Sequence, residues 1–241
     1  MKYMGSKNRH AKELVPILTE YRKSGQTYVE PFVGGFNMID KLENPRIAND
    51  THPYLIELFQ ALQKGWVPPD EVTEDEYKDI RENMGSYPPA LVGFVGFGCS
   101  YSGKWFGGYA RGNDSKGNPR NYAAESKRNI LKQLEKIRNV KIQNDHYLEL
   151  EVPENSIIYC DPPYKGTTQY KDTFDHEVFW NWVREKVAEG HTVYVSEYSA
   201  PKDFICIWMK RVNSSLEKDT GSKQGIEKLF IHKSQVDEWL L

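Results

Sequence analysis

The chain has 241 residues, 39% of them hydrophobic and 27% charged, with a formal net charge of −2. This length can bury one sizeable core, or one core with an inserted lobe, and the composition is ordinary for a globular protein. No apolar run approaches membrane-spanning length and the N-terminus lacks a signal-peptide core, so we expect a cytoplasmic protein without membrane contact. The cysteines, Cys99, Cys160 and Cys206, form no Cys-x-x-Cys pair, which argues against a disulfide framework and a structural zinc site.

The first motif spans residues 3–7, Tyr-Met-Gly-Ser-Lys. Its glycine and serine predict a turn, and Ser6 or Asn8 can cap the helix expected over 10–22. A turn at a helix N-terminus exposes backbone donors that favour an anionic group such as a carboxylate. The alternative is a capped first helix with an exposed Lys7.

A glycine turn follows the short strand predicted over 27–29. The turn lies in residues 30–38, where Gly34 and Gly35 let the backbone approach a ligand closely. We expect a strand, a glycine turn and then a helix. The spacing is not Gly-x-Gly-x-x-Gly and no Gly-Lys-Ser/Thr follows, so neither a dinucleotide fingerprint nor a phosphate loop is supported.

Asp50 ends a second predicted strand, over 46–50, and lies 16 residues after Gly34. An acid at this place, about 20 residues beyond the glycine turn, commonly holds ribose hydroxyls. The alternative is that Asp50 or Thr51 caps the helix predicted over 53–63, and both interpretations can hold at once.

The composition changes between residues 65 and 138. A helix predicted over 75–83 precedes a stretch rich in glycine and aromatic residues, and a second helix is predicted over 123–137. Residues 101–138 carry a net charge of +6, which leaves −8 for the rest of the chain. Basic residues interleaved with aromatic ones suit a nucleic-acid backbone, whereas the alternative is a solvated helix with a loop. The candidate DNA contacts are Lys104, Arg111, Lys116, Arg120, Lys127 and Arg128.

The apolar strand predicted over 156–160 ends abruptly in Asp161-Pro162-Pro163-Tyr164. Proline lacks an N–H and fixes its φ, so the strand must stop at Asp161. In open α/β sheets, ligands bind at the carboxyl ends of the strands. A carboxylate, a proline carbonyl and an aromatic ring together suit a planar base that bears an amino group. The alternative is a plain turn from strand to loop.

The remaining pattern predicts strands over 140–143, 192–196, 204–212 and 228–232, and helices over 176–189 and 235–241. Strands that alternate with helices favour a mostly parallel sheet, and the late strands with little helix between them suggest an antiparallel edge. No cluster of His, Cys, Asp or Glu has metal-ligand spacing, so no metal site is expected.

In this order, the motifs resemble those of the Dam-like adenine-N6 DNA methyltransferases, in the group where the cofactor motifs come first and Asp-Pro-Pro-Tyr last. The resemblance implies an α/β fold, with a Rossmann-like S-adenosylmethionine-dependent methyltransferase sheet and an inserted, mostly helical target-recognition lobe. Residues 1–64 and 139–241 would form the catalytic domain, and residues 65–138 the inserted DNA-binding region. It further implies that Asp161, Pro162 and Tyr164 are catalytic. The implied contacts to S-adenosylmethionine are Tyr3, Lys7, Glu30, Pro31, Phe32, Gly34, Asp50, Tyr147 and Asp161.

The expected activity is site-specific methylation of a flipped-out adenine in double-stranded DNA, by a monomer or weak dimer, as in restriction-modification systems. Cytosine-N4 enzymes usually begin the catalytic motif with Ser, so Asp161 favours adenine. The same motifs would also suit an RNA adenine methyltransferase or a catalytically silent DNA-binding module. The sequence departs from the family pattern at Phe36-Asn37, where small residues are more common, and at His146, where many members have an acid.

Overall fold

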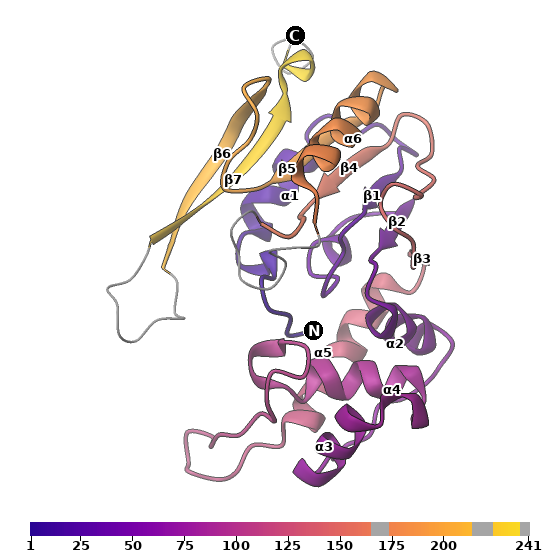
Figure 1. Ribbon diagram of the computed structural model, residues 1–241, viewed down its shortest axis with the longest axis vertical. Helices are drawn as coiled ribbons and strands as arrows, with labels where there is room; N and C mark the ends of the chain where they lie inside the picture. Colours follow the sequence, from indigo (N-terminus) through magenta and orange to yellow (C-terminus); the bar gives the residue numbers. More distant parts are fainter. Residues whose placement is uncertain (165–173, 214–223, 237–241) are drawn as a thin grey trace.

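The computed structural model describes residues 1–164, 174–213 and 224–236. Its centre is a seven-stranded sheet with the strand order β3-β2-β1-β4-β5-β7-β6 (Figure 1). The strands are β1 (Tyr28–Glu30), β2 (Arg46–Asn49), β3 (Lys141–Gln143), β4 (Ile157–Cys160), β5 (Thr192–Ser196), β6 (Phe204–Asn213) and β7 (Gln224–His232).

The first five strands are parallel, and β7 runs antiparallel to both β5 and β6. The expected mostly parallel sheet with an antiparallel edge is therefore confirmed. β1 pairs with β2 on one side and with β4 on the other, so the strand order reverses between β1 and β4. In sheets of this kind the crevice at such a switch point is where ligands bind.

Helices cover both faces of the sheet (Figure 1). Side chains of α1 (Ala11–Thr19) and α2 (Pro53–Gln63) pack in one hydrophobic cluster with Tyr28 and Ile157, whereas side chains of α6 (His176–Ala188) pack in another with Val29 and Ile158. Neighbouring residues of β1 and β4 thus contribute to opposite faces, as the alternation of side chains along a strand requires. Both strands are buried on both sides, which explains the continuous apolar sequence of β4.

Residues 65–138 form a helical lobe below the sheet in Figure 1. It contains α3 (Glu74–Glu82), α4 (Pro89–Gly93), the π-helix η4 (Phe94–Gly98) and α5 (Tyr122–Ile137). Both helices expected in this region, over 75–83 and 123–137, are confirmed. The hydrophobic core of the lobe is continuous with the cluster under α1 and α2, because Phe94 and Ile130 belong to that same cluster. The division into two domains stays a prediction.

The α-helix expected after the glycine turn is wrong. Between the glycine turn and β2, only the short 3-10 helix η2 (Ile39–Lys41) forms. Phe36 takes a left-handed conformation with φ of 59°, and the amide of Gln133 on α5 donates to the carbonyl oxygens of Gly35 and Phe36. These carbonyls are satisfied by the lobe instead of by a helix of their own.

The two terminal helices also differ from expectation. The first helix, expected over 10–22, ends at Thr19, and Ser6 caps the short helix η1 (Lys7–Arg9) that precedes α1. Of the last helix expected over 235–241, residues 237–241 lie outside the described residues, and Gln235 ends the 3-10 helix η6 (Lys233–Gln235). No helix within the described ranges is long and apolar enough to cross a membrane.

Packing of the lobe against α2 should be sensitive to one glycine. A Cβ added at Gly93 would lie 2.1 Å from the backbone oxygen of Tyr54, so Gly93→Ala must push α4 away from α2. We expect a loss of about 1–3 kcal/mol in the free energy of unfolding, measured by urea denaturation. Gly85→Ala is the matched control, because a Cβ there meets nothing within 4 Å. Equal stability of the two variants would contradict this packing.

Candidate active site

The carboxyl ends of β1 and β4 bring the two main sequence motifs together. β1 ends at Glu30 and continues into the glycine turn, and β4 ends at Cys160, directly before Asp161. The strands are neighbours in register, with Val29 opposite Ile158. The predicted catalytic and cofactor motifs therefore meet at the switch point of the sheet.

Lys7 is buried between two acids at this edge. Its side chain is 7% exposed, and its Nζ lies 3.1 Å from Asp161 Oδ1 and 3.3 Å from Glu227 Oε2. The same nitrogen is 4.5 Å from the centroid of the Tyr164 ring, whose hydroxyl donates to Glu227 Oε2 at 2.9 Å. The alternative of an exposed first-helix lysine is therefore wrong. We call these four residues, Lys7, Asp161, Tyr164 and Glu227, the lysine cluster.

The lysine cluster holds one cation against two carboxyl groups. Burial alone would lower the pKa of Lys7, but Asp161 and Glu227 outweigh burial and raise it, so the lysine stays charged. Burial raises the pKa of Asp161, the Lys7 ammonium opposes this rise, and the Glu227 carboxylate adds to it. With all three groups ionised, this edge of the sheet carries a net negative charge.

Asp50 fixes the glycine turn. Its carboxylate accepts hydrogen bonds from the backbone N–H groups of Gly34 and His52, both at 3.0 Å, and burial raises its pKa. The N-cap of α2 is His52, whose Nδ1 accepts from the Leu55 N–H, so the capping role expected for Asp50 or Thr51 is wrong. Gly34 has a φ of 49°, and a Cβ there would lie 2.8 Å from the Tyr3 ring, which explains the glycine.

Two polar side chains are buried at the strand ends, and one of them, Asn49, connects neighbouring strands. Glu30 is 2% exposed, accepts a hydrogen bond from the Tyr28 hydroxyl at 2.9 Å, and has a pKa raised well above its ordinary value by burial. Asn49, at the end of β2, donates to the carbonyl oxygens of Pro31 and Asp145 at 3.1 and 2.9 Å. The carboxyl ends of β1, β2 and β3 are thereby held at fixed spacing.

The expected cofactor contact Tyr147 is a core residue. It is 3% exposed, and its ring packs 5.3 Å from that of the half-buried Phe32. His146 is exposed beside it, and its Nδ1 accepts from the Leu148 N–H. Phe36, where the sequence departs from the family pattern, is fully buried, and its ring centroid lies 3.9 Å from that of Phe59. This departure therefore changes the core under α2.

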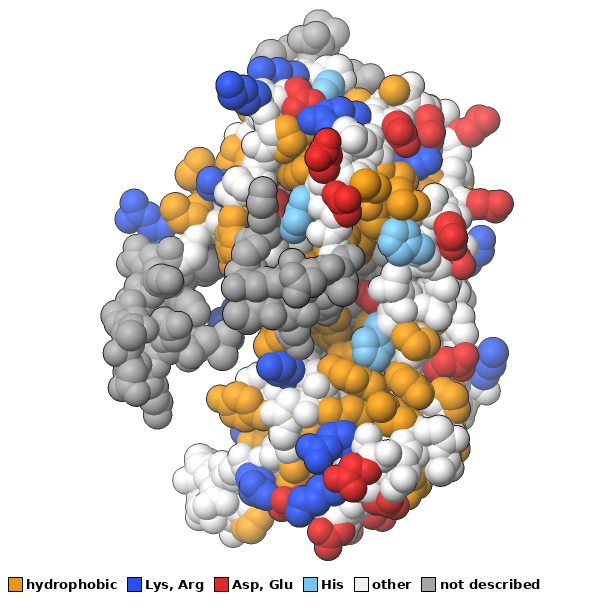
Figure 2. Space-filling model, viewed as in Figure 1, with side chains coloured by type: hydrophobic (Ala, Val, Ile, Leu, Met, Phe, Trp, Pro, Cys, Tyr) orange, Lys and Arg blue, Asp and Glu red, His pale blue; other side chains and the backbone are white. Residues whose placement is uncertain are grey.

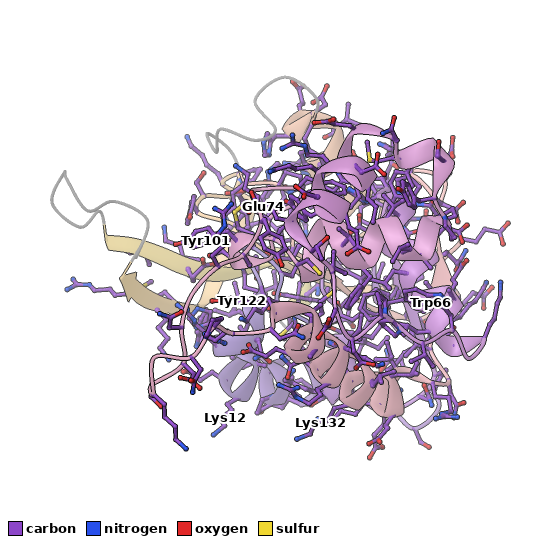
Figure 3. The ribbon with its side chains drawn as sticks, turned by 90° about the horizontal axis from the view of Figure 1, so that it is seen from below. Lys12, Trp66, Glu74, Tyr101, Tyr122 and Lys132 are labelled. Atoms are coloured by element: carbon purple, nitrogen blue, oxygen red, sulfur yellow. The ribbon has the colours of Figure 1, made fainter. Side chains whose placement is uncertain are left out.

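The six expected DNA contacts fall into two groups. Arg111 pairs with Glu74, Arg120 with Glu125, and Lys127 with Asp70. The other three, Lys104, Lys116 and Arg128, are exposed and make no ion pair within the part of the chain that the structure describes. Acidic and basic side chains mix at the lower end of the molecule (Figure 2). In the view from below, Glu74, Tyr101 and Tyr122 lie toward the β6–β7 hairpin and Trp66 lies on the other side (Figure 3).

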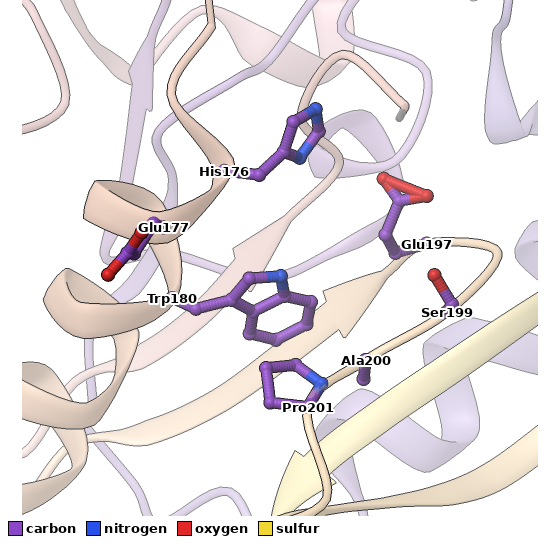
Figure 4. Close-up of a pocket in the computed structure, with 7 residues that line it drawn as sticks. All are labelled: His176, Glu177, Trp180, Glu197, Ser199, Ala200 and Pro201. Atoms are coloured by element: carbon purple, nitrogen blue, oxygen red, sulfur yellow. The ribbon is translucent and has the colours of Figure 1, made fainter. Parts of the chain in front are cut away.

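A cavity of about 320 Å³ lies at the carboxyl end of β5 and the start of α6 (Figure 4). Glu197, which follows β5 directly and is 2% exposed, faces it together with Trp180 and His176. Because β5 pairs with β4, the cavity opens at the same edge of the sheet as Asp161. Among the described residues, no group of three or more His, Cys, Asp or Glu is arranged to hold a metal ion.

Sequence reasoning missed four residues of this edge: Tyr28, Asn49, Glu197 and Glu227. Tyr28 could have been found, because residues two apart on a strand share a face and Glu30 was already a candidate. Glu227 gave no local signal, since its place depends on how β7 inserts between β5 and β6.

Removal of the buried cation should destabilise the protein. We expect Lys7→Met to cost about 3–5 kcal/mol in the free energy of unfolding at neutral pH, because two largely buried carboxylates lose their counter-ion. The deficit should shrink as the pH falls and these acids take up protons. It should also shrink above pH 10.5, because the unfolded chain then releases the lysine proton that folded Lys7, whose pKa is raised, still binds. Denaturant titrations over pH measure this, with Lys12→Met, an exposed lysine of α1, as the control. A deficit that does not depend on pH would count against the cluster.

Comparison with known proteins identifies the family. The model of the D12 class N6 adenine-specific DNA methyltransferases matches residues 3–88 and 107–212. The Type II methyltransferase M.FokI of Planomicrobium okeanokoites is 25% identical over 211 residues, which cover 77% of this chain and 32% of M.FokI. The chain thus spans about a third of the length of that curated relative. The family expected from the four motifs is confirmed: the chain belongs to the D12 class N6 adenine-specific DNA methyltransferases.

Proposed function

We propose that this chain transfers a methyl group from S-adenosylmethionine to the N6 amine of an adenine in a specific site of double-stranded DNA. The observation that carries the proposal is the position of the Asp161-Pro162-Pro163-Tyr164 motif. It starts where β4 ends at the switch point, in contact with Lys7 and beside the glycine turn after β1. Family membership supports the same reaction.

The side chains at this edge fit the cofactor chemically. S-adenosylmethionine carries positive charge on its sulfonium and amino groups and has two ribose hydroxyls. The edge offers the carboxyl groups of Asp50 and Asp161, which when ionised suit both cations and hydroxyl donors. It also offers the buried carboxyl group of Glu30, which can accept hydrogen bonds in either protonation state. When bound, the cofactor supplies an electrophilic methyl group. Asp50, which Gly34 and His52 hold in place, would receive the ribose.

Asp161 and Pro162 are the proposed acceptors for the target amine. The nitrogen is a poor nucleophile because its lone pair is delocalised into the ring. A carboxylate and a carbonyl that each accept one N–H favour a tetrahedral nitrogen with its lone pair directed at the methyl group. Positive charge grows on this nitrogen during transfer, so fixed acceptors stabilise the transition state more than the ground state. A carboxylate accepts about four hydrogen bonds, so the contact with Lys7 leaves capacity for the amine.

Tyr164 is the proposed platform for the base. The target atom of the base cannot be reached inside a duplex, so the adenine must be flipped out. Stacking on an aromatic ring is worth about 1–3 kcal/mol per base in other nucleic-acid sites. The hydroxyl of Tyr164 is held by Glu227, so the ring is positioned before the base arrives.

The product of the reaction tests the proposal. The protein is incubated with labelled S-adenosylmethionine and, in separate reactions, unmethylated DNA or RNA, and the digested nucleosides are identified by mass spectrometry. We expect N6-methyladenine. N4-methylcytosine as the main product would establish a cytosine-N4 enzyme instead, and methylation of RNA alone would establish an RNA methyltransferase.

Loss of the acceptor carboxylate should abolish most turnover. We expect Asp161→Ala to lower kcat by about 10²–10³-fold, the cost of removing a fixed transition-state contact, while DNA affinity is kept. Asp75→Ala, which removes a carboxylate that is 98% exposed on α3, serves as the control in the same assay. Near-normal turnover of a folded Asp161→Ala protein would remove Asp161 from the mechanism.

Contacts of the lobe with phosphates should appear in the salt dependence of DNA binding. Replacing Lys104, Lys116 or Arg128 by Gln should each reduce the slope of log affinity against log salt by up to about 0.9. Arg111→Gln should change the slope less, because Arg111 is already paired with Glu74. If none of the three replacements changes the slope, the DNA surface lies elsewhere.

A further inference from the structure

A largely buried carboxylate outside the recognised motifs contacts Lys7 and Tyr164. The side chain of Glu227 is 15% exposed, and its Oε2 lies 3.3 Å from Lys7 Nζ and accepts from the Tyr164 hydroxyl at 2.9 Å. The family match ends at residue 212, so Glu227 lies outside the matched stretch.

The β6–β7 hairpin brings Glu227 to this place. β7 pairs with β5 through Leu229, Phe230 and Ile231, so Glu227 lies two residues beyond the last pair, at the carboxyl end of β5. On β6, the residue opposite Glu227 is Lys210, which forms an ion pair with Glu13 of α1. This contact anchors the hairpin beside the N-terminal segment that carries Lys7.

Charge is what Glu227 adds to the site. Lys7 and Asp161 alone would form a neutral pair, whereas methyl transfer builds positive charge on the amine nitrogen. A second carboxylate on Lys7 leaves a surplus negative charge next to the reacting atoms, which favours a cationic transition state. Only an acid that is ionised can supply this surplus.

The two nearest groups on the central strands do not supply that charge. Glu30 faces Asp161 from β1, but burial raises its pKa well above the ordinary value, which favours the neutral carboxyl. Tyr159, from β4, shares a hydrogen bond with Ser196 at 2.8 Å, and burial raises its pKa too. Within the described part of the chain, Lys7 and Glu227 are the charged groups that shift the pKa of Asp161.

Three further groups near the lysine cluster have shifted pKa values. Burial raises the pKa of the Cys160 thiol and of the Tyr198 hydroxyl, and it lowers the pKa of the His10 imidazole. Each of these shifts favours the neutral form of the group near pH 7. None of the three adds negative charge beside Asp161.

We propose that Glu227 is a positioning residue for methyl transfer. It shares the Lys7 ammonium with Asp161 and holds the Tyr164 hydroxyl, so that Asp161 meets the target amine within a cluster of net negative charge. This inference rests on the proposed function and extends it to a residue on the antiparallel edge of the sheet.

The test is Glu227→Gln, which keeps the size and a hydrogen-bond acceptor but removes the charge. We expect kcat to fall about 10-fold to 100-fold, less than for a direct contact, with little change in the Kd of S-adenosylmethionine. The Glu227 charge raises the pKa of Asp161, so Asp161 in the variant should stay ionised to lower pH. The acid limb of kcat/KM should therefore move to lower pH, which a merely structural defect would not produce.

Glu13→Gln is the matched control, because it weakens the anchor of the same hairpin on α1 without touching the cluster. It should leave the acid limb in place. Glu227→Asp, which restores the charge on a shorter side chain, should return the limb toward its wild-type position. An unchanged limb and kcat in Glu227→Gln would overturn the proposal, as would an equal shift in Glu13→Gln.

A second measurement does not depend on methylation. The pKa of Asp161, followed by NMR of its carboxyl carbon in the protein alone, should be lower in Glu227→Gln than in the wild type. An unchanged pKa would refute the role of Glu227 even where the wild type methylates DNA. A lowered pKa in a protein whose wild type yields no N6-methyladenine would refute the proposed function and leave the electrostatic coupling standing.

Discussion

The ion pairs of Lys7 hold together three distant parts of the chain. The lysine comes from the N-terminal segment, Asp161 from the end of β4, and Glu227 from the last strand. An ammonium buried in this way is stable only because both acids compensate it, and the acids in turn depend on the ammonium. This edge of the sheet is thus assembled only when the sheet, the first helix and the hairpin are all in place.

Burying these charges has a cost in stability. Groups whose charges are buried, such as Asp50 and Asp161, have raised pKa values, which means that the fold works against their ionised forms. The backbone donors on Asp50 and the ammonium on Asp161 offset part of this cost. Perturbed groups of this kind concentrate at functional sites, and here they lie at the switch point of the sheet.

The fold could be predicted where local rules decide. The prolines after Asp161 stop β4, and the residue order of the chain places that acid at the carboxyl edge. The helix α2, with Pro53 at its start, has the boundaries that its apolar spacing predicts. The predictions were wrong where tertiary contacts override the local sequence pattern. The side chain of Gln133 satisfies a backbone carbonyl in the stretch where a helix was expected after the glycine turn. The ring of His52 caps α2 in place of Asp50.

For the candidate site, the sequence pointed only to residues that belong to a recognisable motif. Asp161, Tyr164, Lys7 and Asp50 carry recognisable neighbours in sequence, and the structure brings them to one edge. Glu227 has no such neighbours, because an isolated acid in a strand resembles any solvent-facing residue. Its role depends on β7 lying between β5 and β6, which no sequence periodicity encodes. The family motif did not indicate that Tyr147 is buried in the core. The contact of Tyr147 with the cofactor stays a prediction.

The continuity of the core between lobe and sheet limits how this protein can be re-engineered. A lobe joined by a flexible linker could be exchanged as a module, but here Phe94 and Ile130 are packed into the same cluster as Leu14 of α1. A chimaera that carries the lobe of another protein must therefore keep the lobe surface that packs against α2, including Gly93 next to the backbone of Tyr54. Only the opposite surface of the lobe can vary. If the lobe reads the target sequence, the same constraint would confine evolutionary changes of target to the loop between η4 and α5 and to the outer sides of α3 and α5.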